Sequence, residues 1–210
     1  MSIPTIARLT LPGRHVLIES HVMLNRIRQL GNEIRVFLNK NTNKRIIFVG
    51  VLTGAANFLM KLLGELDVNM YIYNFVKVSR YTSSQQGGEA HVTFDGVSDA
   101  DVKGSVVVIV DDIADERITN RCLIDHYLGR GALEVKVCVM LNKFQHKSSA
   151  ANVKLDWVGY DIPDVFVWGF GLDDSNNPMT RNDHDLCYWG EEIDINGFLY
   201  TLPNPMTMSP

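Results

Sequence analysis

The stretch that decides the fold reads Ser105-Val-Val-Val-Ile-Val110-Asp-Asp-Ile-Ala-Asp115-Glu-Arg-Ile-Thr119. Its apolar residues, Val106 to Val110, predict a strand that is buried on both faces, as is typical of a central strand in a parallel sheet. Asp111 and Asp112 follow that strand directly, and a helix is predicted over about residues 118–128. Acidic side chains at the carboxyl end of a central strand, close to a helix start, lie where open α/β sheets bind ligands.

This arrangement indicates a ribose-phosphate site. Two neighbouring carboxylates can each accept a hydrogen bond from one hydroxyl of a ribose diol, and the backbone N–H groups at a helix start can hold a phosphate. A third carboxylate, Asp115, lies close to the same helix start. A simpler interpretation stays open, because an acidic pair standing alone more often ends a strand and caps a helix.

The composition limits the class of protein. The 210 residues suffice for one domain with a full-sized core, and 46% hydrophobic and 21% charged residues are ordinary for a soluble globular protein. The net charge of −4 argues against a nucleic-acid partner. No run of about 18 apolar residues is present, so we expect no membrane partner.

The cysteines and the N-terminal residues predict a cytoplasmic protein. Cys122, Cys138 and Cys187 are scattered and odd in number, which fits thiols in a reducing compartment better than a disulfide framework. The N-terminus lacks the apolar core of a secretory signal. Residues 1–18 contain arginines and no acid, so targeting to an organelle stays open.

Apolar periodicity predicts strands that alternate with helices. Helices are predicted over residues 16–39 and 55–66, and further strands over 45–52, 70–78, 134–141, 155–160 and 165–170. The alternation predicts an α/β fold with a mostly parallel, twisted sheet flanked by helices. Residues 81–90 form a long polar connection, which fits an active-site cover and a plain hairpin tip equally well. After residue 173 we expect loop and one short strand.

Five motifs then follow one another between about residues 46 and 173. They are Val51-Leu52-Thr53-Gly54, Val76-Lys77-Val78-Ser79-Arg80-Tyr81, Val110-Asp111-Asp112-Ile113-Ala114-Asp115, Leu141-Asn142-Lys143 and Trp157-Val158-Gly159-Tyr160-Asp161-Ile162-Pro163-Asp164-Val165-Phe166-Val167-Trp168-Gly169-Phe170-Gly171-Leu172-Asp173. In this order they resemble the hypoxanthine–guanine branch of the purine-salvage phosphoribosyltransferases. The resemblance implies a type I phosphoribosyltransferase fold as a single domain, residues 1–210. Its core would span about residues 40–172, with a small hood formed by the N-terminal helix and the C-terminal tail.

The resemblance also implies a reaction. Such enzymes convert 5-phosphoribosyl-1-pyrophosphate and a 6-oxopurine into a nucleoside monophosphate and pyrophosphate, with Mg²⁺ as cofactor, and work as homodimers or homotetramers. The chemistry passes through an oxocarbenium-like state, so the placement of charge matters more than a protein nucleophile. Which of hypoxanthine, guanine and xanthine is preferred is left open by the sequence.

The resemblance implies that the ribose and its phosphate bind at residues 111–119. Asp111 and Asp112 would hold the ribose hydroxyls, directly or through Mg²⁺, and Asp115 would act as general base toward the purine N7. The 5′-phosphate would be held by Thr119 and by the amides that precede it, those of Glu116, Arg117 and Ile118.

The pyrophosphate and the purine are implied to bind on neighbouring segments. Thr53 and Gly54 would contact pyrophosphate through backbone amides, with Arg181 as an additional ligand, and Asp173 would border the purine and coordinate Mg²⁺. The purine would be bound by Lys143 at O6, by Phe166 through stacking and by the carbonyl of Val167. Taken singly, Lys143 would be a surface lysine and Phe166 a core aromatic.

The phosphate side departs from the family pattern. Where the family usually reads Asp-Thr-Gly-x-Thr, this chain reads Asp115-Glu116-Arg117-Ile118-Thr119, which puts an acid beside the phosphate and replaces a glycine. Arg117 could reach the phosphate or fill the pocket. Arg80 replaces the serine of the usual Ser-Tyr pair, and Met179 stands where an arginine is expected, so Arg181 is the candidate substitute.

Two classes of function therefore stay open. One is an active 6-oxopurine phosphoribosyltransferase with a remodelled phosphate loop. The other is a catalytically weakened relative that keeps the fold as a nucleotide sensor or as a subunit of a larger assembly. Asp115 favours the enzyme, whereas Glu116 and Arg117 favour the relative.

Overall fold

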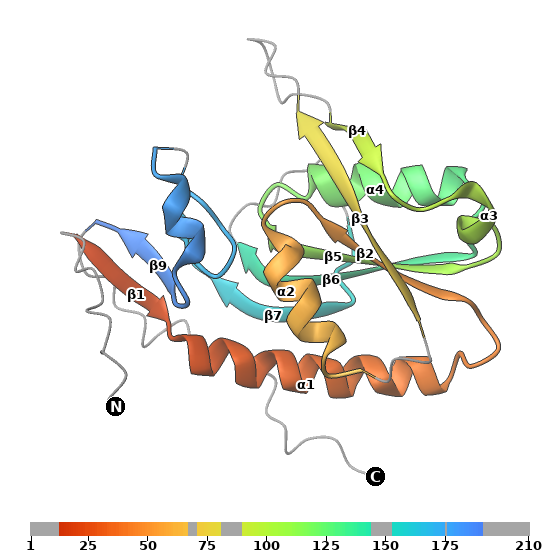
Figure 1. Cartoon of the computed structure of the whole chain (residues 1–210), viewed down its shortest axis with the longest axis horizontal. Helices are drawn as coiled ribbons and strands as arrows, with labels where there is room; N and C mark the ends of the chain where they lie inside the picture. Colours follow the sequence, from red (N-terminus) through yellow and green to blue (C-terminus); the bar gives the residue numbers. More distant parts are fainter. Residues whose placement is uncertain (1–12, 67–70, 81–89, 144–152, 175, 191–210) are drawn as a thin grey trace, which may run out of the picture.

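The main sheet has six strands in the order β4-β3-β2-β5-β6-β7 (Figure 1). The structure is a computed structural model that describes residues 13–66, 71–80, 90–143, 153–174 and 176–190. Every neighbouring pair is parallel except β3 and β4, which confirms the mostly parallel sheet. The strands are β2 (Ile46–Val51), β3 (Ile72–Arg80), β4 (Ala90–Asp95), β5 (Val106–Ala114), β6 (Glu134–Lys143) and β7 (Trp157–Ile162).

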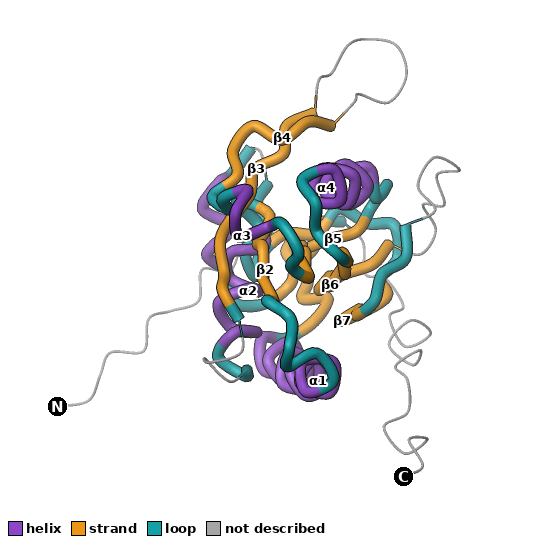
Figure 2. The backbone as a smooth tube through the Cα atoms, turned by 90° about the vertical axis from the view of Figure 1, so that its right-hand side faces the viewer, coloured by secondary structure: helices purple, strands orange, loops and turns teal. Residues whose placement is uncertain are grey.

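The predicted central strand, β5, is buried on both faces. Val106, Val108 and Val110 belong to one hydrophobic cluster, and Val107 and Ile109 belong to the other. This division follows from the two-residue period of a strand. Helices α1 (Ser20–Asn39) and α2 (Ala55–Leu63) contribute to the first cluster. Helix α4 (Ile118–Gly129) and the short α3 (Asp99–Val102) contribute to the second, so helices cover both faces (Figure 2).

A separate small sheet with the order β1-β9-β8 forms a hood on the left of Figure 1. It comprises β1 (Arg14–Ile18), β8 (Val167–Trp168) and β9 (Leu186–Trp189), with the 3-10 helix η1 (Pro178–Asn182) beside it. Two predictions are corrected here. Residues 16–18 belong to β1 and not to a helix, because Glu19 is extended and α1 starts only after it. Strand 165–170 shortens to β8 and lies in the hood, not in the core sheet.

The hood thus contains the N-terminal strand β1 and not the N-terminal helix, because α1 packs on the main sheet. Arg26 fixes that packing from a position that is only 5% exposed. Its guanidinium donates from Nε to the Gly159 carbonyl (3.0 Å) and from Nη2 to the Val158 carbonyl (2.7 Å). It also pairs with Glu33 at 2.7 Å. A buried guanidinium with these partners anchors the helix to β7.

The remaining differences concern boundaries and three unpredicted elements. Strands β5 and β6 run four and two residues past their predicted ends, to Ala114 and Lys143, so Asp111 and Asp112 lie within β5. Strand β4, helix α3 and the 3-10 helix η1 were not predicted. The polar connection 81–90 falls, apart from Ala90, outside the residues that the structure describes.

Candidate active site

A cavity of about 240 Å³ opens where β2, β3 and β5 end. The carboxyl ends of the central parallel strands point toward the hood (Figure 1), which is where open α/β sheets bind ligands. Most of the residues predicted around the ribose phosphate line this cavity: Asp111, Asp112, Asp115, Arg117 and Thr119. Val51, Leu52, Val78, Arg80, Ile113 and Asn120 complete its lining.

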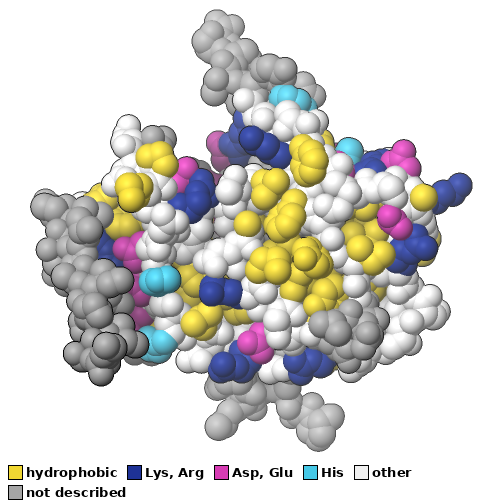
Figure 3. Space-filling model, in the orientation of Figure 1, with side chains coloured by type: hydrophobic (Ala, Val, Ile, Leu, Met, Phe, Trp, Pro, Cys, Tyr) yellow, Lys and Arg dark blue, Asp and Glu magenta, His cyan; other side chains and the backbone are white. Residues whose placement is uncertain are grey.

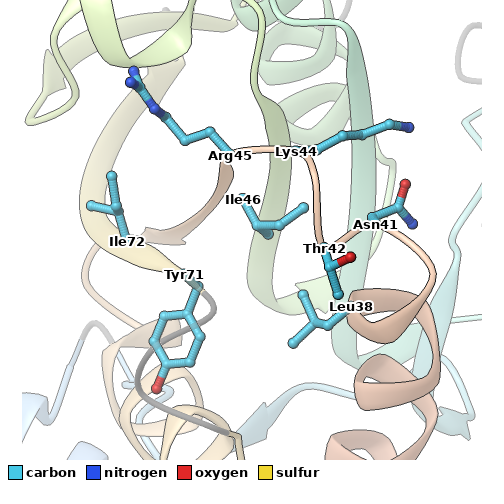
Figure 4. A pocket seen from close by; sticks show the side chains of 8 residues that line it. All are labelled: Leu38, Asn41, Thr42, Lys44, Arg45, Ile46, Tyr71 and Ile72. Carbon is cyan, nitrogen blue, oxygen red and sulfur yellow. The ribbon is translucent and has the colours of Figure 1, made fainter.

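A larger cavity, of about 440 Å³, lies at the opposite edge of the sheet, by the amino ends of β2 and β3 (Figure 4). Its two cations do not converge, because Lys44 and Arg45 point in different directions in Figure 4. Arg45 donates instead to the carbonyl of Ala100 at 3.0 Å. The tyrosine hydroxyl of Tyr71 donates to the Leu63 carbonyl at 3.0 Å. We therefore assign the functional site to the carboxyl edge.

The acidic pair, Asp111 and Asp112, is held by hydrogen bonds from backbone N–H groups and from the side chain of Asn120. Asp111 is only 4% exposed, and its Oδ2 accepts from Asn120 Nδ2 at 2.8 Å. Its Oδ1 accepts from the backbone N–H of Asp112 at 3.1 Å, and Asp112 Oδ1 accepts from that of Ile113 at 2.8 Å. Burial, followed by the charge of Asp112, raises the pKa of Asp111 well above its usual range, and burial also raises the pKa of Asp112. A cation or a hydroxyl-rich ligand would relieve this desolvation.

The loop before α2 packs directly against Asp112. Gly54 has an ordinary helical backbone, but a Cβ at this position would lie 1.4 Å from Asp112 Oδ2. Only a glycine therefore allows this close approach. Thr53 is exposed on the same loop, and its peptide bond to Leu52 is cis. The contact brings the predicted pyrophosphate loop and the acidic pair together.

The predicted base and the predicted O6 donor lie side by side. Lys143 Nζ lies 3.2 Å from Asp115 Oδ2 and 3.3 Å from Asp164 Oδ1. The lysine is 11% exposed, whereas the two carboxylates are 39% and 40% exposed. Strands β5 and β6 are neighbours in parallel register, so the residues that follow β5 meet the end of β6. Two acids thus hold the ammonium, and of these three residues only Asp115 lines the cavity.

The unusual loop residues Glu116 and Arg117 point to different partners. Glu116 Oε2 accepts from Arg80 Nη1 at 2.6 Å. Arg117 has a positive φ of 60°, at the position where the family usually has glycine. Its guanidinium donates to the Val153 carbonyl (3.0 Å) and to Asn142 Oδ1 (3.1 Å). Arg117 thus fills the pocket wall. Beyond it, Ile118 begins α4.

The hood places Asp173 and Arg181 next to each other. Arg181 Nη2 lies 2.6 Å from Asp173 Oδ2, and the charge of Arg181 lowers the pKa of Asp112, against the effect of burial. The turn that precedes Asp173 has three consecutive positive φ angles: 89° at Gly169, 53° at Phe170 and 113° at Gly171. A Cβ at Gly171 would lie 2.5 Å from the carbonyl oxygen of Gly54. The hood therefore touches the loop that touches Asp112.

Two predicted purine residues lie just outside this group. Val167 is 5% exposed in β8, whereas Phe166 is 57% exposed, which is high for a large aromatic side chain. Neither lines the 240 Å³ cavity. Both precede the turn that carries Asp173, and Asp164, which pairs with Lys143, lies two residues before Phe166. Their segment therefore borders the site.

The sequence interpretation missed three residues of the site. Asn120 holds Asp111, Asp164 pairs with Lys143, and Arg80 lines the cavity and pairs with Glu116. An amide in the first turn of a helix that follows an acidic pair could have indicated Asn120. The positions of Asp164 and Arg80 depend on the sheet order, which no local pattern gives.

The oxygen donors at the site suit a Mg²⁺ ion. Among the described residues, no three His, Cys, Asp or Glu side chains form a ready metal cluster. Mg²⁺ is typically held by one or two carboxylates together with waters and substrate phosphates, so such a cluster is not needed. The buried acidic pair and the exposed carboxylate of Asp173 supply hard oxygen donors of this kind. The residues present therefore fit Mg²⁺.

Comparisons with known proteins agree on one family. The phosphoribosyl transferase domain matches residues 23–175. The hypoxanthine-guanine phosphoribosyltransferase of Bacillus subtilis is 31% identical over 159 residues, 75% of this chain and 84% of that protein. The hypoxanthine phosphoribosyltransferase of Haemophilus influenzae is 31% identical over 179 residues, 85% and 94% of the two chains. A crystal structure of a hypoxanthine phosphoribosyltransferase from Staphylococcus aureus has a TM-score of 0.73 at 25% identity and covers 84% of this chain and 91% of that one.

Proposed function

The chain belongs to the phosphoribosyltransferase family, and we propose that it is a purine-salvage enzyme that transfers a phosphoribosyl group from 5-phosphoribosyl-1-pyrophosphate to a 6-oxopurine. The products are a nucleoside monophosphate and pyrophosphate. The observation that carries the proposal is the placement of Lys143 Nζ 3.2 Å from Asp115 Oδ2, because Asp115 lines the cavity together with the acidic pair. A base and a donor side by side match N7 and O6, which are adjacent on one edge of a purine.

Lys143 and Asp115 divide the recognition of the purine between them. Asp115 accepts the N7 proton as N9 bonds to the ribose carbon, so it is the general base of the forward reaction. Lys143 can only donate hydrogen bonds. It therefore binds the O6 acceptor of hypoxanthine or guanine and rejects adenine, whose amino group at that position is itself a donor. Phe166 and the Val167 carbonyl complete the purine site by stacking and by accepting an N–H.

The ribose and phosphate groups bind along the decisive stretch. Asp112, supported by Asp111, accepts hydrogen bonds from the ribose hydroxyls. The 5′-phosphate lies at the start of α4, at Thr119 and the amides of residues 116–118, where the helix dipole favours an anion.

The pyrophosphate lies between the loop at Thr53 and Gly54 and the hood. Arg181 fits the role of pyrophosphate ligand, because it is held at Asp173, which follows the turn that touches the carbonyl of Gly54.

Mg²⁺ is the cofactor that we propose. Asp173 and the acidic pair, the latter directly or through the ribose hydroxyls, are the residues that would hold it. When bound, it would draw negative charge from the departing pyrophosphate. The protein's own part is to fix the ribose, to orient the purine edge and to hold the N7 proton at Asp115.

The alternative of a catalytically weakened sensor or subunit is not favoured. It was favoured by Arg117 and by Glu116, an acid beside the phosphate. That acid is paired with Arg80, so its charge is balanced within the site. The relatives named above also carry the names of enzymes, and this chain matches them over most of their length.

We further propose one domain over residues 1–210 that self-associates as a dimer or tetramer in the cytoplasm. Apolar side chains gather over α2 and the start of β3 (Figure 3), where Met60, Ile72 and Tyr73 are each about half exposed. A patch of this kind supports self-association. Among the described residues, no helix is long and apolar enough to span a membrane. None of the three cysteines forms a disulfide.

The test is turnover of the purified protein with 5-phosphoribosyl-1-pyrophosphate, Mg²⁺ and each of hypoxanthine, guanine, xanthine and adenine. Asp115→Ala serves as background. We expect product above that background with at least one 6-oxopurine and none with adenine. A folded sample that forms no nucleotide with any of the three 6-oxopurines would contradict the proposed function.

A further inference from the structure

Two of the positions at which this chain departs from the family pattern contact each other. Arg80 is the last residue of β3, and Glu116 lies in the loop between β5 and α4. These segments are separated in the sheet by β2, yet Arg80 Nη1 donates to Glu116 Oε2 at 2.6 Å. The guanidinium therefore reaches across the carboxyl end of β2 to the phosphate loop.

The cavity needs a cation that faces its ligand. Three carboxylates line it, at Asp111, Asp112 and Asp115, and its ligand carries a dianionic phosphate. The other arginine of the lining, Arg117, already donates to a carbonyl and an amide oxygen in the cavity wall. Arg80 is 40% exposed and lines the same cavity.

We propose that Arg80 binds the 5′-phosphate of the substrate and product, and that Glu116 is the positioning residue that holds its guanidinium over the phosphate loop. The inference rests on the proposed function. A guanidinium has five N–H donors in a fixed fork. Among the residues that the structure describes, Glu116 is the one hydrogen-bond partner of the Arg80 guanidinium, so its other donors are available for phosphate oxygens. Planar forks of this kind suit phosphates.

The proposal gives Glu116 a role at a position where an acid would otherwise repel the phosphate. Alone it would oppose a phosphate by like charge. Paired with Arg80, it fixes one nitrogen of the guanidinium and so reduces the conformational entropy that phosphate binding would cost. The alternative is that Arg80 merely neutralises Glu116. In that case the two residues would be dispensable together.

Calorimetric titration of the ligand-binding site separates the two accounts. The ligands are IMP and inosine, which differ only in the phosphate, and the proteins are wild type, Arg80→Gln, Glu116→Gln and the double variant. We expect Arg80→Gln to weaken the binding of IMP by roughly 10- to 100-fold, which is the scale of a hydrogen bond to a charged group. The affinity for inosine should stay unchanged. Glu116→Gln should weaken IMP by a smaller factor, and the double variant should bind IMP no better than Arg80→Gln.

A matched control is available on the neighbouring helix. Arg121 is 48% exposed and pairs with Asp125 at 3.9 Å outside the cavity, so Arg121→Gln removes a similar surface arginine. It should leave IMP binding unchanged, and thermal unfolding should show that all variants are folded. Inhibition by inorganic pyrophosphate, if unaffected by Arg80→Gln, would assign Arg80 to the 5′-phosphate and not to the leaving group.

Several outcomes would overturn the inference. Wild-type IMP affinity in Arg80→Gln, or in the double variant, would show that Arg80 only balances a charge. If Arg80→Gln lost inhibition by pyrophosphate but kept its IMP affinity, Arg80 would be a pyrophosphate ligand and not a phosphate ligand. Tighter IMP binding by Glu116→Gln would overturn the positioning role of Glu116. Failure of wild-type protein to bind IMP or to turn over would instead contradict the proposed function itself.

Discussion

Gly54→Ala tests how closely the pyrophosphate loop and the acidic pair are fitted together. The backbone of Gly54 (φ −61°, ψ −41°) is helical, so alanine is compatible with it and the added methyl is the whole perturbation. That methyl carbon would lie 1.4 Å from Asp112 Oδ2 and 2.6 Å from its Cγ. Ordinary van der Waals contact starts at 3.4 Å, so the two groups must separate by about 2 Å.

The expected effect is large on activity and modest on stability. A displacement of about 1 Å at reacting groups can cost roughly 100-fold in rate, so we expect kcat/KM for 5-phosphoribosyl-1-pyrophosphate to fall by at least that factor. The fold should lose only about 1 to 3 kcal/mol, the usual cost of overpacking. Steady-state kinetics measure the first quantity and urea unfolding the second.

Gly129→Ala is the matched control, because a Cβ at the last residue of α4 meets nothing within 4 Å. It should leave kinetics unchanged. If Gly54→Ala retained kcat/KM within about threefold of wild type, a margin far below the 100-fold expected of such a displacement, the position of Asp112 would not control the reaction. The reasoning from this contact would then be wrong.

Four further changes have defined outcomes. Asp115→Asn should reduce turnover by at least about 100-fold, because it removes the general base, and leave IMP binding within a few-fold; equal losses of both would contradict this role. Lys143→Met should raise KM for 6-oxopurines by roughly tenfold or more, and unchanged KM would place the purine elsewhere. Burial raises the pKa of Asp111, so its protonated form stabilises the fold and this contribution is lost as pH rises through the raised pKa. As pH rises, the free energy of unfolding measured with urea should therefore fall for wild type relative to Asp111→Asn, and a constant difference between the two would refute this. Burial also raises the pKa of Cys187 to about 12, so iodoacetamide should alkylate half-buried Cys122 first in the native protein, as mass spectrometry can show; the reverse order would contradict the burial seen here.

The central sheet could be predicted because its signals are local. Val106 to Val110 form an uninterrupted apolar run, and such a run followed by acids and a helix start has few interpretations. The position of the acidic pair at the carboxyl edge follows from the same run, since parallel strands end at one edge.

The hood could not be predicted in the same way, because its strands pair across almost the whole chain. Val16 of β1 lies opposite Cys187 of β9. The apolar residues of β1 continue into the periodicity of α1, so the sequence favoured one long helix. Strand β8 has two residues and depends on β9 for its hydrogen bonds. A strand this short gives no periodic signal.

The side-chain contacts of the site were beyond local patterns for a related reason. The sequence showed Arg80 and Glu116 as two separate departures from the family pattern. Their pairing requires that β3 and β5 flank β2, which is a property of the sheet order. Arg117 likewise could reach the phosphate or the pocket wall, and only the positions of Asn142 and Val153 decide between the two.

A crystal structure of the protein with IMP and Mg²⁺ tests the account most directly. We predict the ribose hydroxyls at Asp111 and Asp112, and the purine O6 within hydrogen-bond distance of Lys143 Nζ. The phosphate should lie between Thr119 and Arg80. IMP bound in the cavity at the amino ends of β2 and β3, or bound at the carboxyl edge with its purine away from Lys143, would contradict the proposed site.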